Sequence, residues 1–337
     1  MNQSAQPGGS QTSSPKIDLG GEGRENRPSL SVRRRQDIWA GRTFFVFSVL
    51  PMGLALIILV MLVVRTWPLL QSHSLVELIT SSVWKPDENL FGFWPFIAGT
   101  LWVTVVAVVL AVPPCLLTAL YLSEYASSST RMLMKPLLDL LAAIPSVVYG
   151  VWGVLAIVPI VGSVIAPFFR RTLGFIPFFA GKNPTGFNIL SGSVVLAVMI
   201  APFIIAVTYE VMATVPQGLR QASLALGTTR WQTIRYAVLP QVFPGIVAGI
   251  VLGASRALGE TMAVIMVVGN VVQTPHSIFD SAYPLPALIA NNYGEMMSIP
   301  MYDSALLGAA LILLVIILIF NVGSTLILRR VIGRSWV

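Results

Sequence analysis

The stretch of residues 220–260 decides how this chain is built, and it reads RQASLALGTTRWQTIRYAVLPQVFPGIVAGIVLGASRALGE. A polar segment that contains Gly227 leads into an apolar segment that also holds Arg256 and Glu260. A charged side chain near the centre of a membrane helix costs about 2.5–3.5 kcal/mol on insertion scales. Two such charges in one apolar segment indicate either a role in function or a close structural pairing.

The composition of the whole chain indicates a membrane protein. Of its 337 residues, 55% are hydrophobic and 10% are charged, and its mean hydropathy is +0.80. A run of about 20 apolar residues is long enough to cross a bilayer as a helix. Six such runs follow one another, at residues 43–64, 95–122, 137–160, 189–211, 242–268 and 305–328. We therefore expect an all-α, polytopic protein with six transmembrane helices.

Positive charge is distributed unevenly between the two sides that these spans define. With the amino terminus inside, fifteen of the 21 Lys and Arg residues fall on the inner side and five on the outer side, and Arg256 lies within a span. An excess of Lys and Arg marks the cytoplasmic side of a membrane protein. We expect both termini in the cytoplasm.

The chain divides into three regions by composition. Residues 1–36 are rich in Gly, Ser, Pro, Gln and Asn, which is typical of a disordered tail, here basic and cytoplasmic. Residues 37–330 form the transmembrane domain, and residues 331–337 form a short cytoplasmic C-terminal tail. The pI of about 9.9 is explained by attraction of the basic segments to anionic lipid, so that no nucleic-acid partner is expected. One cysteine, Cys115, and two distant histidines predict no metal site.

Glycine recurs at every fourth position of the fifth span, at Gly245, Gly249 and Gly253. Such a ridge of small residues lets a neighbouring helix approach closely. On one continuous helix, Arg256 and Glu260 would project on about the same side as the ridge. They could then pair at i, i+4, although arginine before glutamate is the weaker order. The sequence leaves open whether the two charges lock helices or subunits together or meet a substrate.

The second possibility predicts a tetrahedral oxyanion as the substrate. The planar guanidinium of Arg256 offers a fork of donors that matches two oxygens of phosphate. Glu260 would accept a hydrogen bond from the P–OH group that phosphate retains near neutral pH and that sulfate lacks. Arg256 and Glu260 are therefore the candidate residues of a substrate pathway.

The polar segment before the fifth span resembles the EAA loop of ABC importer permeases. The resemblance rests on the spacing and on four residues, Ala222, Gly227, Leu239 and Pro240. Gln221 and Ser223 depart from it, because they replace the glutamate and the second alanine of the family pattern. The resemblance implies that residues 214–240 form a cytoplasmic coupling loop of two short helices that docks on an ATPase. Gly227 is expected at the turn between these helices, where glycine tolerates a positive φ, or as an ordinary helix C-cap.

Further segments are similar to permeases of phosphate importers of the PstC type. They are YLSEYA at 121–126, AIPSVVYG at 143–150, RALGETMAV at 256–264 and ANNYGE at 290–295. The resemblance covers residues 40–330 and implies a MetI-like fold in the bacterial cytoplasmic (inner) membrane. It also implies ATP-driven, binding-protein-dependent transport of inorganic phosphate, with an intramembrane arginine and glutamate at the positions of Arg256 and Glu260.

The same resemblance implies a set of partners. They are a second permease of the PstA type, an ATPase dimer of the PstB type and an extracytoplasmic phosphate-binding protein of the PstS type. No Walker A sequence occurs in this chain. We therefore expect that the chain is not an enzyme and has no cofactor of its own, and that ATP and magnesium are bound by the partner ATPase.

Three other interpretations remain open. A secondary transporter or channel would also place Arg256 and Glu260 in the membrane, with the glutamate as a proton relay, but it would not need the coupling loop. A membrane enzyme is disfavoured because no His, Cys or paired carboxylates have catalytic spacing. A sulfate or molybdate importer permease shares the loop and the fold, and only the segments at 121–126 and 256–260 favour phosphate, by resemblance.

Overall fold

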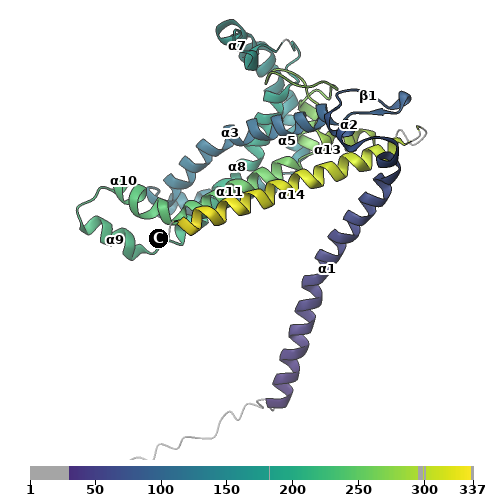
Figure 1. Ribbon diagram of the computed structural model, residues 1–337. Coiled ribbons are helices and arrows are strands. Elements are labelled where there is room, and N and C mark those ends of the chain that lie inside the picture. The colour runs from purple at the N-terminus through teal and green to yellow at the C-terminus, as the bar shows by residue number, and fades with distance from the viewer. Residues whose placement is uncertain (1–29, 182, 295–298, 300, 335–337) are drawn as a thin grey trace, which may run out of the picture. The chain divides into compact units, whose positions relative to one another are not determined.

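A computed structural model describes residues 30–334 of the chain, apart from residues 182, 295–298 and 300. The chain divides into two units, residues 1–58 and 59–337, and each is described by itself. The first unit contains the beginning of α1 (Leu30–Ser72), a single helix that continues into the second unit. Figure 1 labels this helix and most of the elements that follow.

The first and last helices extend into the two predicted tails. Residues 30–36 belong to α1, so the prediction of disorder is wrong for them, and residues 1–29 lie outside the described residues. Leucine and arginine are good helix formers, and extending an existing helix costs less than starting one. For the same reason α14 (Tyr302–Arg334) includes residues 331–334 of the predicted C-terminal tail, and residues 335–337 lie outside the described residues.

The described chain is almost entirely helical, and six of its helical segments are long and apolar enough to cross a membrane. These segments are Ile38–Ser72, Trp94–Glu124, Ser146–Leu173, Ile189–Ala213, Arg230–Leu258 and Tyr302–Arg330. The prediction of an all-α protein with six spans is therefore confirmed.

The elements between α1 and α14 are α2 (Leu75–Thr80), β1 (Trp84–Lys85), β2 (Leu90–Phe91), α3 (Trp94–Glu124), α4 (Ser128–Ala143), α5 (Ser146–Trp152), α6 (Val158–Ile160), α7 (Ala166–Leu173), α8 (Ile189–Ala213), α9 (Gln217–Ala225), α10 (Arg230–Thr233), α11 (Leu239–Leu258), α12 (Met262–Val267) and α13 (Leu285–Asn292). The structure also has π-helical turns at Gly153–Ile157, Val161–Ile165 and Ile234–Val238, and 3₁₀ turns at Pro86–Glu88 and Pro177–Phe179.

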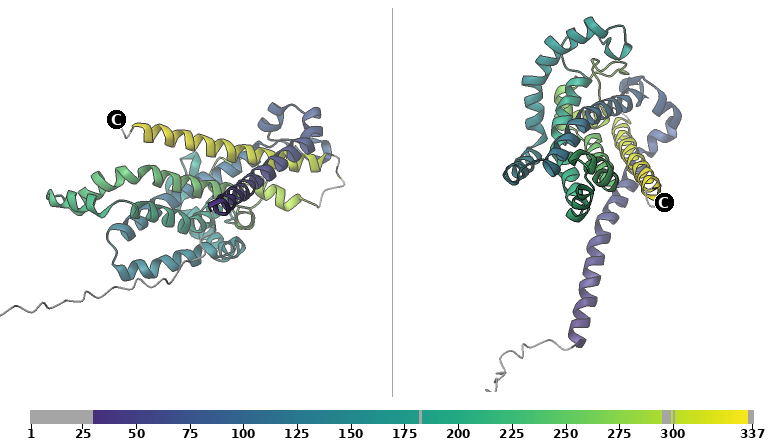
Figure 2. Two further views of the ribbon diagram at one scale, coloured as in Figure 1. Left: turned by 90° about the horizontal axis from the view of Figure 1, so that it is seen from below. Right: turned by 90° about the vertical axis from the view of Figure 1, so that its left-hand side faces the viewer.

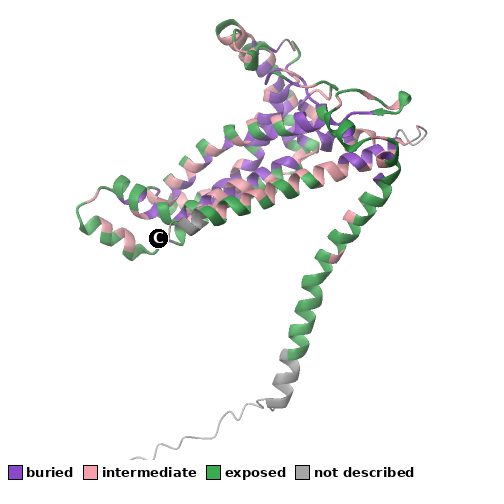
Figure 3. Ribbon diagram, in the orientation of Figure 1, coloured by how far each residue is buried: buried purple, intermediate pink, exposed green. Residues whose placement is uncertain are grey.

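Helix α8 forms the centre of the second unit. It packs against α3, α11 and α4, and its residues Ile189, Leu196, Ile200, Ile204 and Met212 are at most 1% exposed. Helix α14 packs on α11, and α3, α8, α11 and α14 run side by side (Figures 1 and 2). The buried residues concentrate along this bundle (Figure 3). Helices α9 and α10 of the coupling loop project from one end of the bundle (Figure 1).

The glycine ridge of α11 faces α8. A Cβ atom at Gly245 would collide with Val211, one at Gly249 would lie 3.0 Å from Val207, and one at Gly253 would lie 2.7 Å from Ile204. These valines and this isoleucine belong to α8. The absence of side chains on the ridge thus allows the two backbones to approach closely.

The third span is not the single helix that was expected over residues 137–160. Pro145 divides it into α4 and α5, and Ile144 before it is extended, with ψ 128°. Proline has no amide hydrogen and excludes helical geometry from the residue before it. Leu138 of α4 shares a small pocket with Ala206 of α8, and Gly153 after α5 packs against Val195 near the start of α8. The broken pair α4–α5 therefore runs along α8, and α7 lies beyond the start of that helix.

The close contact between α11 and α8 predicts an effect of filling one glycine. We expect Gly253→Val to lower the midpoint of thermal unfolding in detergent, because overpacking a filled core costs about 1–3 kcal/mol. Gly323 of α14 provides a matched control, since no heavy atom lies within 4 Å of the position of its Cβ. Equal unfolding midpoints for Gly253→Val and Gly323→Val, measured by scanning fluorimetry, would contradict the packing described here.

Candidate functional site: a charged helix break and a coupling loop

Arg256 and Glu260 do not lie on one helix, so the expected i, i+4 geometry is wrong. Helix α11 ends at Leu258, and α12 begins at Met262. The N–H of Gly259 donates to Arg256 O, and the N–H of Glu260 donates to Ala257 O, each at 3.3 Å. These i to i+3 bonds tighten the last turn and end the helix, as is common at helix termini. The fifth span therefore breaks between its two charges.

Arg256 lies in the last turn of α11 and is exposed on the surface of this chain. Among the residues that the structure describes, no ion pair joins it to Glu260 or to another carboxylate. A cation at membrane depth requires compensation by protein, by water or by a ligand. Within the described chain, the C-terminal end of α11 is the feature that favours this cation, and no carboxylate neutralises it.

Glu260 lies in the break and is partly buried. Its Oε1 accepts a hydrogen bond from the backbone N–H of Ala263 at 3.3 Å, which places the carboxylate at the start of α12. It also lines a small pocket with Thr100 and Thr104 of α3. The Oγ1 of Thr100 accepts a hydrogen bond from the N–H of Leu285 in α13, at 2.9 Å. The carboxylate thus lies where α3, α12 and α13 meet.

Helix α12 is held in place by close packing on α5. A Cβ atom at Gly150 would lie 2.6 Å from the sulfur of Met266 and 3.3 Å from Cα of Ala263. Met266 also lines a cavity of about 730 Å³ at the end of the bundle opposite the coupling loop. Other residues of this cavity carry amide or hydroxyl groups, namely Asn183, Thr185, Asn270, Gln273 and Ser281. Helix α12 therefore lies between a polar cavity and the break that contains Glu260.

The coupling loop has the expected form of two short helices around a glycine. Helix α9 contains Gln221, Ala222 and Ser223, and Gly227 after it has φ +82°. The N–H of Gly227 donates to Leu224 O at 2.9 Å, which closes α9. Gly227 therefore serves as both the turn between the helices and the C-terminal cap of the first. Thr229 begins α10 with a capping box formed with Gln232.

Ser223, which departs from the family pattern, connects the two helices of the loop. Its Oγ lies 3.0 Å from Thr228 Oγ1 and 3.0 Å from Thr233 Oγ1. Thr228 Oγ1 also donates to Ser223 O at 2.8 Å. An alanine at position 223 could not make the hydroxyl contacts. The other departure, Gln221, is exposed and lines a pocket beneath the loop.

Leu239 and Pro240 form the first turn of α11, directly after the π-helical turn Ile234–Val238. The N–H of Leu239 donates to Ile234 O, five residues earlier. Proline has no N–H to donate in a regular helix. The wider turn and Pro240 together form the junction between the coupling loop and the fifth span.

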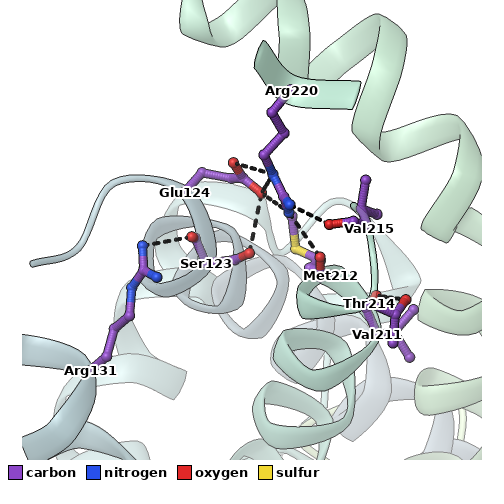
Figure 4. Close-up of polar contacts among 8 residues, drawn as sticks. All are labelled: Ser123, Glu124, Arg131, Val211, Met212, Thr214, Val215 and Arg220. Atoms are coloured by element: carbon purple, nitrogen blue, oxygen red, sulfur yellow. Dashed lines mark hydrogen bonds and ion pairs between the residues drawn. The ribbon is translucent and has the colours of Figure 1, made fainter. Parts of the chain in front are cut away.

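An ion pair that the sequence analysis did not anticipate ties the coupling loop to the bundle (Figure 4). Nη2 of Arg220 in α9 lies 2.9 Å from Oε1 of Glu124 at the end of α3, and both side chains are only about one-tenth exposed, at 12% and 11%. Nε of Arg220 donates to both carboxylate oxygens at 3.3 Å. The same guanidinium donates to the carbonyl oxygens of Val215 and Met212 at the end of α8.

No local pattern indicates this pair, because its two members are 96 positions apart in the sequence. Glu124 lies at the end of an apolar span, where a solvated carboxylate is common. Only the side-by-side packing of α3 and α8 brings it to Arg220. The loop segment that was expected to dock on an ATPase is therefore fixed to the ends of two spans.

Comparison with known proteins identifies the class of this protein. Residues 115–333 match the family of binding-protein-dependent transport system inner membrane components. The chain belongs to this family, and it is a multi-pass inner-membrane subunit of an ABC importer. It is 38% identical over 259 residues to the phosphate transport system permease protein PstC of Xylella fastidiosa. The aligned region covers 76% of this chain and 79% of the relative.

Other relatives span similar lengths. The identity is 33% over 293 residues with PstC of Haemophilus influenzae, covering 86% of this chain and 92% of the relative. It is 37% over 254 residues with the probable ABC transporter permease protein YqgH of Bacillus subtilis, covering 75% and 77%. Among solved structures, a bacterial ABC transporter involved in the import of alginate superposes with a TM-score of 0.56 at 17% identity, over 89% of this chain and 97% of that chain. The last match shows the MetI-like fold.

Membership in this family identifies the chain as an importer subunit and not as a secondary transporter or a channel. Importers of this class have their ATPase in a separate subunit and receive substrate from a binding protein. The coupling loop and the break at Glu260 are thus parts of one transport subunit.

The Glu124–Arg220 pair predicts a coupling defect. Removing one partner of a buried ion pair costs about 3–5 kcal/mol, because the other charge remains desolvated. We expect Arg220→Glu in the assembled transporter to reduce transport per ATP hydrolysed. The double variant Glu124→Arg with Arg220→Glu should recover part of the loss, because the bonds to Val215 O and Met212 O are not restored.

The exposed pair Lys85–Glu88, with side chains 57% and 58% exposed, provides the control for this experiment. Lys85→Glu should leave the amount of substrate transported per ATP hydrolysed unchanged, since exposed ion pairs contribute about 0–1 kcal/mol to stability. Uptake and ATP hydrolysis are measured on the same proteoliposomes. A double variant no better than Arg220→Glu alone would show that the charge pairing does not matter.

Proposed function

We propose that this chain is the PstC-type permease subunit of an ATP-driven, binding-protein-dependent importer of inorganic phosphate. The observation that carries the proposal is the similarity to PstC proteins over most of the chain, together with an arginine and a glutamate at the break between α11 and α12. The exposed guanidinium of Arg256 supplies two parallel donors for a phosphate. Glu260 supplies an acceptor for a P–OH group that phosphate retains near neutral pH.

The exposure of Arg256 supports a pathway shared with a second subunit. Each permease of such an importer forms half of the pathway, and a second permease of the PstA type would cover the surface that Arg256 leaves open. The break separates the two charges, so that neither neutralises the other. An anion that enters between the subunits can then contact both. Sulfate has no O–H group to donate to the Glu260 carboxylate and would be repelled by it, so this site favours phosphate.

The ends of the bundle suit different partners. The coupling loop exposes Leu226 at 85%, Tyr236 at 72% and Trp231 at 53%, and such apolar and aromatic side chains are frequent in protein interfaces. We assign this surface to an ATPase dimer of the PstB type in the cytoplasm, where ATP and magnesium bind. The polar cavity at the opposite end would open toward a phosphate-binding protein of the PstS type. Both chain termini lie in the cytoplasm in this assignment.

The geometry suggests how ATP hydrolysis reaches the pathway. Closure of the ATPase dimer moves α9, and the Arg220–Glu124 pair passes this movement to α3. Helix α3 runs from Glu124 through Pro113 and Pro114 back to Thr104 and Thr100, over about 30–36 Å at 1.5 Å per residue. These threonines line the pocket of Glu260. The movement thereby changes the surroundings of Glu260, and access alternates between the two sides.

Uptake of labelled phosphate by proteoliposomes tests the role of Arg256. The complete transporter should import phosphate only with ATP and the binding protein, and Arg256→Ala should lose uptake by about 100-fold while the complex assembles normally. The variant loses hydrogen bonds to a charged ligand, and each such bond contributes about 1.5–3 kcal/mol. Arg330→Ala, which removes an exposed charge from the end of the last span, is the control. Failure of Arg256→Ala to assemble with its partner permease would make Arg256 structural.

A second experiment tests the role of Glu260 in discrimination. Glu260→Gln retains the size of the side chain but removes the charge that repels a fully ionised anion. We expect slower phosphate uptake and stronger competition by sulfate, measured as the sulfate concentration that halves uptake. Asp303 at the start of α14 lies outside the pocket of Glu260, so Asp303→Asn serves as the control. Unchanged phosphate uptake with unchanged exclusion of sulfate would rule out this role.

A further inference from the structure

A second cavity, of about 250 Å³, lies beneath the coupling loop and is separate from the proposed pathway. It is bounded by α9 and α10 and by the ends of α3, α4 and α8. Three arginines line it, Arg131 of α4, Arg220 of α9 and Arg230 of α10, together with one carboxylate, that of Glu124. Neither Arg256 nor Glu260 belongs to it. The cavity is too small for most drug-sized ligands but has room for a small anion.

The three arginines differ in how many of their donors are used. Arg220 is bound to Glu124 and to two backbone carbonyls, so its role is structural. Arg131 donates from Nη2 to Ser123 O at 2.9 Å, while its Nε is buried and has no hydrogen-bond partner among the described residues (Figure 4). A buried donor without a partner is costly. Arg230 has no ion pair in the described part of the chain. Two guanidiniums therefore have donors to offer to a ligand.

The charge around the cavity favours an anion. Glu124 is already paired with Arg220, which leaves Arg131 and Arg230 uncompensated within the cavity. An adjacent small pocket shares Arg131 and is lined by Lys135, Asp139 and Glu210. None of these carboxylates lies within 4 Å of a basic nitrogen of Arg131 in the described structure. Gln221 and Thr233 add neutral hydrogen-bonding groups to the wall.

We propose that this cavity binds a phosphate group, held by Arg131 and Arg230. Guanidinium groups bind phosphate oxygens in pairs, and phosphate accepts from several donors at once. The ligand is either free phosphate from the cytoplasm or the headgroup of an anionic phospholipid at the membrane surface. A bound phosphate would connect α4 of the bundle with α10 of the loop. It would restrain the movement of the loop and slow ATP hydrolysis.

Binding of radiolabelled phosphate to the complete transporter tests the site. The complex is placed in phosphatidylcholine nanodiscs without nucleotide or binding protein, and every sample carries Arg256→Ala to remove the pathway arginine. This design makes the result independent of the proposed transport substrate. We expect saturable binding that Arg131→Gln and Arg230→Gln each weaken about tenfold or more, because each loses a charged hydrogen bond. Arg235→Gln, an exposed arginine of the same loop outside the cavity, should bind as the parent does.

A lipid arm distinguishes the two sources of the phosphate group. If phosphatidylglycerol in the nanodiscs excludes phosphate, and native mass spectrometry finds one more retained lipid on the parent than on Arg131→Gln, the ligand is a lipid headgroup. If phosphate binds equally in both lipids, the ligand is free phosphate. Either result supports the site. The site would be overturned if the parent, Arg131→Gln and Arg230→Gln bound phosphate equally and retained lipid equally. It would also be overturned if all of the bound phosphate were on the ATPase subunit.

ATP hydrolysis by complexes with intact Arg256 tests the restraint on the loop. In phosphatidylcholine, added phosphate should lower the steady-state rate of the parent more than that of Arg131→Gln. Product inhibition at the ATPase itself is common to both samples and cancels in the comparison. Equal inhibition of the two complexes would overturn the regulatory role.

Discussion

The close packing of α11 on α8 is the constraint on which the rest of this structure depends. Membrane helices gain little from burying apolar surface against each other, so that their association depends on close contact between backbones. Three glycines spaced by four residues provide that contact along the middle of α11. The contact fixes the direction of α11, and thereby the place where it ends. That end carries Arg256, and the break beyond it carries Glu260.

The break separates the two charges and gives them different surroundings. Had the helix continued, Arg256 and Glu260 could have neutralised each other within one chain. Instead Glu260 is held at the start of α12, among residues of α3 and α13, while Arg256 remains on the exposed surface. One charge is thus fixed within this subunit and the other faces outward, which suits a pathway built from two subunits.

The coupling loop is attached to the bundle by both apolar packing and polar contacts. Val215, Leu219 and Val238 pack in one apolar cluster with residues of α3, α8 and α11. No residue of α9 is fully buried, and its polar connection to α3 and α8 is made by one guanidinium with several acceptors. Such directional bonds transmit displacement and still allow the loop to present its outer surface to a partner. The cavity beneath the loop is a consequence of the same arrangement, and Arg131 and Arg230 in its wall have no ion-pair partner among the described residues.

The sequence by itself determined the number of spans, the form of the coupling loop and the two charges of the candidate site. Each of these rests on a local property: long apolar runs, the spacing around Gly227, and charges inside an apolar segment. It did not determine where helices break. The break at Pro145 and the end of α11 at Leu258 both lie inside apolar runs that were each expected to form one span. The Glu124–Arg220 pair, the orientation of the glycine ridge toward α8 and the arginine-lined cavity were decided by tertiary structure alone. The physical reason is that each depends on which distant segments pack together, and apolar periodicity in a membrane carries little information about helix neighbours.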